Sequence, residues 1–228
     1  MPELPVTTQH RPDILARTLR INEIFFSIQG ETSKVGLPTA FIRLTGCPLR
    51  CQYCDTSYAF YEGQKISLAE IVQTISTFRT RHVTVTGGEP LAQKACLDLL
   101  NYLCDEAYQV SLETSGAIDL AGVDMRVVKI LDIKTPGSRQ AAKNKFDNLA
   151  YITAQDQIKF VICDRTDYQW SIQIIKQYQL TDRCEVYFSP SHDELQAVTL
   201  ADWILQDKLP VRLQVQLHKY LWGDVPGK

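Results

Sequence analysis

Apolar and polar positions along this 228-residue chain follow two different periods. Residues 82–86 (His-Val-Thr-Val-Thr) alternate with the period of two that is typical of a strand, whereas apolar residues from 68 to 78 recur at helical spacing. Ser67 and Glu70 form a capping-box pattern, which predicts where that helix begins. The same criteria predict strands at residues 19–29, 40–45, 110–113, 127–133, 157–162, 185–188 and 211–217, and helices at 91–106, 167–178 and 194–206.

The order of these elements predicts the architecture. Strands that alternate with helices indicate parallel pairing, in a barrel or a doubly wound sheet. Ligands in such folds bind at the carboxyl ends of the strands. Residues 138–154 are polar and irregular, which is compatible with a missing or shortened helix. The predicted strand ends carry Cys47, Gly87–Gly88, Glu113–Thr114 and Lys134–Thr135.

Composition narrows the class of protein. Apolar residues make up 45% and charged residues 22% of the chain, which is typical of a soluble globular protein. With a formal net charge of -2 and no basic block, we expect no direct binding to nucleic acid or to an anionic membrane. Residues 1–20 are expected to form an N-terminal extension without the apolar core of a signal peptide, and residues 21–228 a single domain. An odd count of seven cysteines predicts a reducing cytoplasm and no disulfide framework.

Three cysteines, Cys47, Cys51 and Cys54, follow directly after one predicted strand. Thiolates suit zinc, copper(I) and iron–sulfur clusters. A structural zinc site has four protein ligands, and a four-iron cluster is normally held by four cysteines. Three thiolates therefore leave one metal position open to an external ligand, and a partial zinc site or a chance cluster is the competing interpretation. The remaining cysteines are interpreted as small core residues: Cys96, Cys104, Cys163 and Cys184.

The spacing of the three cysteines resembles the signature of the radical S-adenosylmethionine enzymes. Tyr53, just before the last cysteine, matches an aromatic preference of that family, and Gly87-Gly88-Glu89-Pro90 resembles its Gly-Gly-Glu-Pro element. The resemblance implies a 4Fe–4S cluster on three cysteines, with S-adenosylmethionine on the fourth iron. The glycines let the backbone approach a ligand closely, although a simple strand-to-helix turn would also explain them.

A closer resemblance covers most of the chain. Residues 23–31 (Glu-Ile-Phe-Phe-Ser-Ile-Gln-Gly-Glu) and 38–56 are similar to the corresponding segments of 7-carboxy-7-deazaguanine synthases. That family converts 6-carboxy-5,6,7,8-tetrahydropterin to 7-carboxy-7-deazaguanine with loss of ammonia, on the route to queuosine in transfer RNA. The resemblance implies an open, partial barrel of about six parallel strands with a reduced set of helices, rather than the closed eight-stranded form.

The resemblance also implies roles for individual residues. Arg43 would contact the substrate carboxylate, because a planar guanidinium pairs with a carboxylate through two hydrogen bonds. Its alternative is a surface ion pair. Thr56 would bind magnesium, and its alternative is a turn or helix cap. His218 would lie near the active site, or it could be an ordinary surface histidine. The other implied substrate contacts are Ile28, Gln29, Gly30 and Thr86, with a polar turn as the alternative for residues 29–30.

The implied cofactor contacts are spread over four strand ends. Lys134 is the firmest match in residues 132–134, because Asp132 and Ile133 depart from the Ser-Pro-Lys of relatives. Relatives also carry glycine where this chain has Thr32. Glu113 lies in a segment that resembles a family strand end, with a plain turn as the alternative. The full set of implied cofactor contacts is Tyr53, Gly87, Gly88, Glu89, Glu113, Asp132, Ile133 and Lys134.

The implied chemistry is a radical rearrangement. One electron from a reducing partner such as flavodoxin would release a 5′-deoxyadenosyl radical, which would take hydrogen from C6 of the pterin, with Mg²⁺ holding the substrate carboxylate. No side chain stands out as a general base. The family resemblance further implies a homodimer. The alternatives are a glycyl-radical-enzyme activase and, in another class, a non-catalytic zinc-binding module. His10, His82 and His192 have no ligand constellation around them in the sequence.

Overall fold

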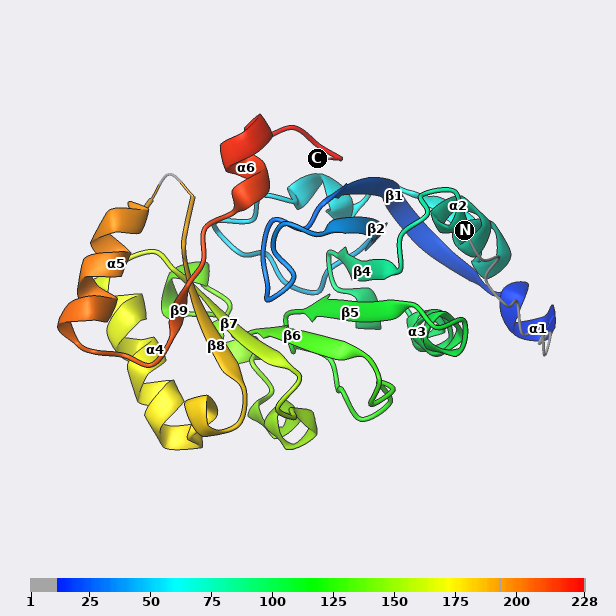
Figure 1. The fold of residues 1–228 in the computed structure, drawn as a ribbon. Coiled ribbons are helices and arrows are strands. Elements are labelled where there is room, and N and C mark those ends of the chain that lie inside the picture. Colours follow the sequence, from blue (N-terminus) through cyan, green and yellow to red (C-terminus); the bar gives the residue numbers. More distant parts are fainter. Residues whose placement is uncertain (1–11, 193, 228) are drawn as a thin grey trace.

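The computed structural model describes residues 12–192 and 194–227 and builds one curved, mostly parallel sheet (Figure 1). Nine strands of the described chain pair in the order β3-β1-β2-β4-β5-β6-β7-β8-β9. From β2 onward every neighbour is parallel, while β1 pairs antiparallel with both β2 and β3. The strands are β1 (Thr18–Ile28), β2 (Pro38–Leu44), β3 (Gln64–Ser67), β4 (His82–Gly87), β5 (Gln109–Thr114), β6 (Val128–Asp132), β7 (Gln157–Ile162), β8 (Glu185–Pro190) and β9 (Arg212–Leu213).

The open, partial barrel predicted from the sequence is confirmed. Strands β2 and β4 to β8 supply the parallel set, and the two-residue β9 extends it. Three short 3₁₀ turns lie between β6 and β7 where a closed barrel would carry a helix, as the polar stretch 138–154 predicted. No helix in the described part of the chain is long and apolar enough to cross a membrane.

Helices pack on the convex face of the sheet, where α2 and α3 lie against its first half and α4 and α5 against its second (Figure 1). The capping box predicted at Ser67 and Glu70 is present in full at the start of α2. Helix α6 stands apart from the others, close to the C-terminus (Figure 1). The helices are α1 (Pro12–Leu15), α2 (Leu68–Ser76), α3 (Ala95–Asp105), α4 (Arg165–Tyr178), α5 (Ala197–Gln206) and α6 (Leu217–Trp222).

Three predicted elements are wrong in their bounds, and β3 was not predicted. The helix predicted at 194–206 begins at Ala197. The helix predicted at 91–106 begins only at Ala95, because Pro90 opens a separate 3₁₀ turn that is capped by the side chain of Glu89. The strand predicted at 211–217 stops after Leu213, and Leu217 instead begins α6. Strand β1 also begins within the predicted extension 1–20, of which residues 1–11, including His10, lie outside the described part of the chain.

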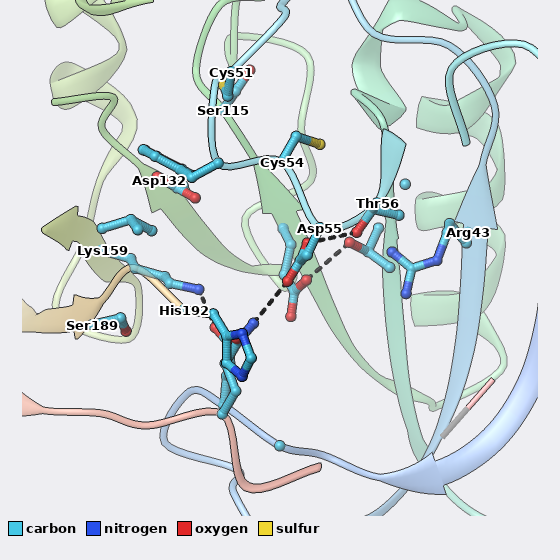
Figure 2. A pocket seen from close by; sticks show the side chains of 18 of the residues that line it. Arg43, Cys51, Cys54, Asp55, Thr56, Ser115, Asp132, Lys159, Ser189 and His192 are labelled. Atoms are coloured by element: carbon cyan, nitrogen blue, oxygen red, sulfur yellow. Dashed lines mark hydrogen bonds and ion pairs between the residues drawn. The ribbon is translucent and has the colours of Figure 1, made fainter. Parts of the chain in front are cut away.

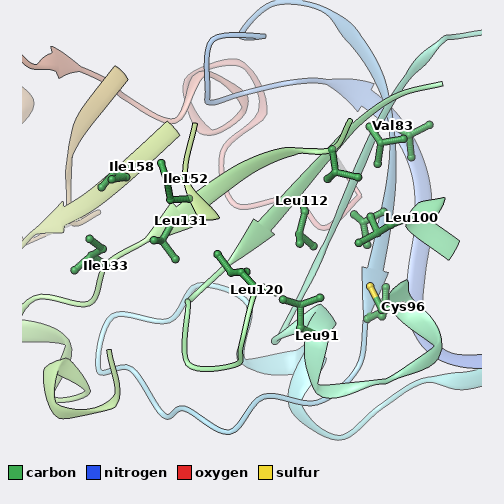
Figure 3. Packing of buried hydrophobic residues seen from close by; sticks show 14 of the residues in the cluster. Val83, Leu91, Cys96, Leu100, Leu112, Leu120, Leu131, Ile133, Ile152 and Ile158 are labelled. Carbon is green, nitrogen blue, oxygen red and sulfur yellow. The ribbon is translucent and has the colours of Figure 1, made fainter. Parts of the chain in front are cut away.

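Strand alternation separates an apolar face from a polar one. On β4, Val83 and Val85 point into the hydrophobic core between sheet and helices (Figure 3). Thr84 and Thr86 therefore face the concave side, because successive side chains of a strand point in opposite directions. The hydroxyl of Thr84 lies 2.8 Å from that of Ser111, its neighbour on β5. Polar side chains on the concave side of the barrel are thus hydrogen-bonded to one another.

Candidate active site

A cavity of about 250 Å³ opens at the carboxyl ends of the parallel strands (Figure 2). It is lined by residues from the loop after β2, from the ends of β4 to β8 and from the C-terminal segment. The structure therefore brings together segments that are far apart in the sequence. The predicted site residues in its lining are Ile28, Gln29, Gly30, Arg43, Cys47, Cys51, Tyr53, Cys54, Thr56, Thr86, Gly87, Gly88, Glu113, Asp132, Lys134 and His218.

The three predicted cluster ligands line this cavity from one loop. Cys47, Cys51 and Cys54 are half-buried free thiols. Burial raises the pKa of all three, that of Cys51 to about 11. Among the described residues no three His, Cys, Asp or Glu side chains converge on one point as ligands of a single ion would. Three thiols on one loop leave one position of a metal centre to an external ligand.

The two glycines at the end of β4 are required by the backbone beside them. A Cβ on Gly87, whose φ is +148°, would lie 2.2 Å from the carbonyl oxygen of Leu44. A Cβ on Gly88 would lie 2.2 Å from the carbonyl oxygen of Gly46 and 2.9 Å from the Cβ of Cys47. The glycines therefore let the end of β4 pack directly against the start of the cysteine loop, which holds the loop at the cavity wall.

A cation lies behind the cysteine loop. The ammonium of Lys134 is 2.9 Å from Asp132 and lies over the ring of Tyr53. Burial alone would lower the pKa of Lys134, but the charge of Asp132 and the neighbouring Tyr53 and Cys51 raise it, so the side chain stays charged. The second oxygen of Asp132, Oδ1, is buried without a hydrogen-bond partner in the described structure. An unsatisfied buried oxygen at a cavity wall is suited to receive a donor from a ligand.

The opposite wall is formed by the loop after β1. The amide of Gln29 donates to Thr84 and accepts from the N–H of Glu31, and its backbone N–H and carbonyl bond within the same loop. Gln29 therefore shapes the cavity floor. Glu31 forms an ion pair with Lys159 across the barrel. Burial alone would raise the pKa of Glu31, but Lys159 and a hydrogen bond from Gln216 outweigh it and lower that pKa.

Arg43 and Glu113 carry opposite charges on adjacent parts of the lining. The Nε of Arg43 is 2.7 Å from Glu23, so the predicted alternative of an ion pair is present, yet the guanidinium also borders the cavity. Thr86, the register partner of Arg43 on β4, donates to Glu113 over 2.9 Å. Burial, together with the nearby charge of Glu31, raises the pKa of Glu113.

The C-terminal segment covers one side of the cavity. Gln216 donates to both Glu31 (2.9 Å) and Asp55 (3.0 Å), and Lys219 lies 3.2 Å from Asp55. His218, between them, is in the lining. Asp55 also accepts a hydrogen bond from Thr56, the predicted magnesium ligand (Figure 2). The segment therefore links the cysteine loop to the loop after β1.

Two predicted cofactor contacts lie outside the lining. Glu89 is fully buried and accepts hydrogen bonds from the N–H and hydroxyl of Ser115 and from Thr114. It fixes the end of β5 beneath the cavity. Ile133 belongs to the hydrophobic core, although the residues on either side of it reach the cavity.

Several lining residues were not predicted from the sequence or had no role assigned to them. Glu31 and Lys159 are joined only by the fold, as are Asp55 and Gln216. Ser189 and Ser191, at the end of β8, are buried, and their hydroxyls have no hydrogen-bond partner in the described structure. Their position after a parallel strand was the available signal. His192 also lies in the lining, although nothing in the sequence surrounds it with ligands.

The other cysteines only partly match their prediction as core residues. Cys96 and Cys104 are buried in α3, as predicted. Cys163 and Cys184 are only half-buried, although Cys184 packs against the hydrophobic core. All four thiols lie outside the cavity lining, so the cysteine loop supplies its sulfur groups alone among the described residues.

Comparison with known proteins agrees with this geometry. Residues 41–132 match the model of the Radical SAM superfamily, so the fold and the thiol-lined cavity define a radical SAM enzyme. The chain is 42% identical to a 7-carboxy-7-deazaguanine synthase from Chlorobaculum tepidum, over 90% of this chain and 94% of that protein. It is 40% identical to one from Koribacter versatilis, over 90% and 97%. The chain belongs to the 7-carboxy-7-deazaguanine synthase family.

A solved structure supports the fold independently. QueE from Escherichia coli superposes with a TM-score of 0.73 at 22% identity, covering 88% of this chain and 95% of that one. The fold is therefore shared by a protein whose sequence has diverged widely. Family membership implies a 4Fe–4S cluster and S-adenosylmethionine as cofactors of this enzyme.

Proposed function

We propose that this enzyme converts 6-carboxy-5,6,7,8-tetrahydropterin to 7-carboxy-7-deazaguanine with release of ammonia, as a radical SAM lyase in queuosine biosynthesis. One observation carries the proposal. The three thiols of Cys47, Cys51 and Cys54 line the same cavity as the segment 28–30 and Arg43, which the family resemblance relates to the pterin. One cavity therefore has groups for both a metal cluster and a small carboxylated substrate.

The cofactor half of the cavity has suitable donors and acceptors. The three thiols would hold the cluster, and the backbone at Gly87–Gly88 would border S-adenosylmethionine. Asp132 Oδ1 and the hydroxyls of Ser189 and Ser191 are buried and unpaired in the described structure, so a bound cofactor would satisfy them. When bound, these cofactors supply a 5′-deoxyadenosyl radical that can take hydrogen from carbon.

The substrate half would be held mainly by charge and shape. Arg43 offers its terminal guanidinium nitrogens to the substrate carboxylate, because Glu23 occupies Nε. Thr56 would join the same carboxylate in holding Mg²⁺, which prefers oxygen ligands and keeps several waters. Glu113 lines the same cavity and accepts a hydrogen bond from Thr86, and burial raises its pKa.

The C-terminal segment would exclude water from this space. Its bonds to Glu31 and Asp55 connect the loop after β1 to the cysteine loop across the cavity, and His218 lines the cavity as well. Exclusion of water protects a reactive radical from side reactions. Entry of the pterin would require these bonds to open, since they connect both sides of the cavity.

The alternatives predict different chemistry in the same cavity. A glycyl-radical-enzyme activase must admit a protein loop, whereas a cavity spanned by Gln216 favours a small molecule. A structural zinc site requires four protein ligands, and three thiols line this cavity among the described residues. A homodimer, a cytoplasmic location and a flavodoxin-like reducing partner remain part of the proposal.

The decisive experiment is anaerobic reconstitution with iron and sulfide, followed by incubation with S-adenosylmethionine and pterin deuterated at C6. We expect 7-carboxy-7-deazaguanine as product and deuterium in 5′-deoxyadenosine. Unlabelled 5′-deoxyadenosine without the product would contradict the proposal and favour a different radical substrate. Bound zinc without acid-labile sulfide would favour the non-catalytic module.

A further inference from the structure

We infer that a second cavity, at the amino ends of the parallel strands, is an effector site for a small organic monocarboxylate. This cavity has a volume of about 240 Å³, close to that of the active-site cavity, and the two cavities have no lining residue in common. It is lined by the first residues of β4 to β7, so it lies at the opposite end of these strands from the cysteine loop. The site goes beyond the proposed function, and only its effect on the pterin rests on that function.

The lining of the second cavity carries one uncompensated positive charge. Lys34, His82 and Arg126 border the cavity, and no aspartate or glutamate of the described chain does. Arg126 is paired with Asp105 and Asp124, so its charge is already compensated. The ion pairs between described residues do not include Lys34. A partly buried ammonium without a counter-ion favours a ligand with a single negative charge.

Two neutral side chains in the lining can add hydrogen bonds to such a ligand. Burial and the nearby charge of Lys34 lower the pKa of His82, so its imidazole is mostly neutral at pH 7. The side chains of His82 and Gln109 make no hydrogen bond to any other described residue. A neutral imidazole and a primary amide can each donate a hydrogen bond to a carboxylate that the ammonium of Lys34 holds.

One wall of the second cavity is apolar. Val128 and Ile130 lie two residues apart on β6, so their side chains point to the same face of the sheet. Ile130 is buried, yet it is not part of the hydrophobic core to which the next residue, Leu131, belongs. Tyr108 also borders the cavity. This wall and the volume favour an organic ligand with an apolar body, because an inorganic ion would leave most of the space empty.

The loop between β1 and β2 contributes to both cavities. It borders the active site at Gln29 and the second cavity at Lys34. Two lining residues of the second cavity hold this loop: Thr84 accepts a hydrogen bond from Gln29 over 3.1 Å, and Gln157 accepts one from the N–H of Ser33 over 3.0 Å. A ligand that binds Lys34 would therefore restrain the loop and order its contacts to the pterin in advance.

The test uses indole-3-carboxylate as the probe and indole-3-carboxamide as its uncharged counterpart of similar shape. The affinity for each is measured by isothermal titration calorimetry on the reconstituted enzyme in the presence of S-adenosylmethionine. Lys34→Met removes the charge and keeps the length of the side chain, whereas Lys34→Arg keeps the charge. The matched control is Lys65→Met, because Lys65 is an exposed cation on β3 that borders neither cavity.

We expect the wild type, Lys34→Arg and Lys65→Met to bind the acid about tenfold or more tightly than the amide, and Lys34→Met to bind both equally weakly. In saturating acid the KM for the pterin should be about twofold or more lower in the wild type than in Lys34→Met, since competition for the active site affects both proteins alike.

Equal affinity of the wild type for acid and amide, or an unchanged preference in Lys34→Met, would overturn the site. Equal KM values in the two proteins would overturn its effector role. If no product forms from the pterin, the proposed function fails, while the calorimetry still decides on the site. The comparison of acid with amide on the wild type needs no variant, so it holds even if Lys34→Met unfolds early.

Discussion

The imidazole of His218 lies directly on the backbone of Gly30. A Cβ on Gly30 would lie 2.0 Å from Nδ1 of His218, and the N–H of the adjacent Leu217 donates to the carbonyl of Gly30 over 3.0 Å. The C-terminal segment and the loop after β1 therefore fit together only because residue 30 has no side chain. This contact joins two parts of the cavity wall that local sequence does not connect.

Gly30→Ala should displace His218 and open the cavity. Because a shift of about 1 Å in a positioned group can cost up to about 100-fold in rate, we expect the KM for the pterin to rise at least tenfold. Cluster content should not change, since the three cysteines are elsewhere. In a His218→Ala background the added methyl has room, so its cost in unfolding free energy should be smaller. Additive costs in the double variant would show that the clash is not the cause.

His218 should make stability depend on pH. Burial lowers its pKa, and the charges of Glu31 and Asp55 only partly oppose that effect. As the pH falls, the imidazole of the unfolded chain, with a pKa of about 6.5, binds a proton at a higher pH than the imidazole of the folded protein does. Its contribution to stability is therefore fully present above about pH 6.5 and falls as the pH drops toward the folded pKa. Urea unfolding at pH 7.5 and 5.5 should show a larger loss for the wild type than for His218→Gln, and equal losses would contradict the assignment.

Arg43 should distinguish substrates with and without a carboxylate. Arg43→Lys keeps the charge but loses the planar fork, so we expect the KM for the pterin to rise about tenfold or more, with turnover changed less. Glu23→Gln is the matched control, because it keeps an acceptor near Nε and should change KM only slightly. A pterin that lacks the carboxylate should bind equally weakly to the wild type and to Arg43→Lys. Equal loss with both pterins would place the role of Arg43 in folding instead.

Thr32 occupies a position that favours glycine. Its φ is +65°, which is strained for a β-branched residue by about 1–3 kcal/mol. A glycine, which the family resemblance implies for relatives at this position, would adopt this φ without strain. Thr32→Gly loses a hydrogen bond from the N–H of Lys34, yet the relieved strain should still raise the unfolding free energy by about 1 kcal/mol and the Tm by about 2–4 °C. A lower Tm would contradict the prediction that the relieved strain outweighs the lost hydrogen bond.

Local patterns were sufficient for most of the strands and for the cysteine loop, but they did not predict β3. The spacing of Cys47, Cys51 and Cys54 is short, so the loop that carries them needs no distant partner to be found. The strand predicted at 211–217 failed because Leu217 gives its N–H to Gly30 rather than to β8. An alternating pattern of apolar residues does not show which distant segment will accept a hydrogen bond, and most of the chain separates Leu217 from Gly30.

The charged residues of the site were harder to predict from the sequence for the same reason. Glu31 and Lys159 pair over a sequence separation of 128 residues, and neither has a nearby pattern that signals the other. Arg43 was predicted both as a substrate contact and as an ion pair, and only the fold shows that Nε is used while the side chain still borders the cavity. The glycines at 87–88 were correctly located, but the backbone that they must accommodate belongs to the end of β2.

Ser189 and Ser191 should contribute to cofactor binding rather than to folding. Their hydroxyls are buried at the cavity without a partner in the described structure, so replacing them by alanine removes no internal hydrogen bond. The double variant Ser189→Ala, Ser191→Ala should keep its Tm but bind S-adenosylmethionine about tenfold more weakly, as measured by anaerobic equilibrium dialysis on reconstituted protein. Ser171→Ala is the matched control. Its hydroxyl is buried in α4 and donates to the carbonyl of Asp167 over 2.8 Å, so this variant should lose about 1 kcal/mol of stability and keep its affinity. Unchanged affinity in the double variant, or a fall in its Tm equal to that of the control, would show that the two hydroxyls serve the fold and not the cofactor.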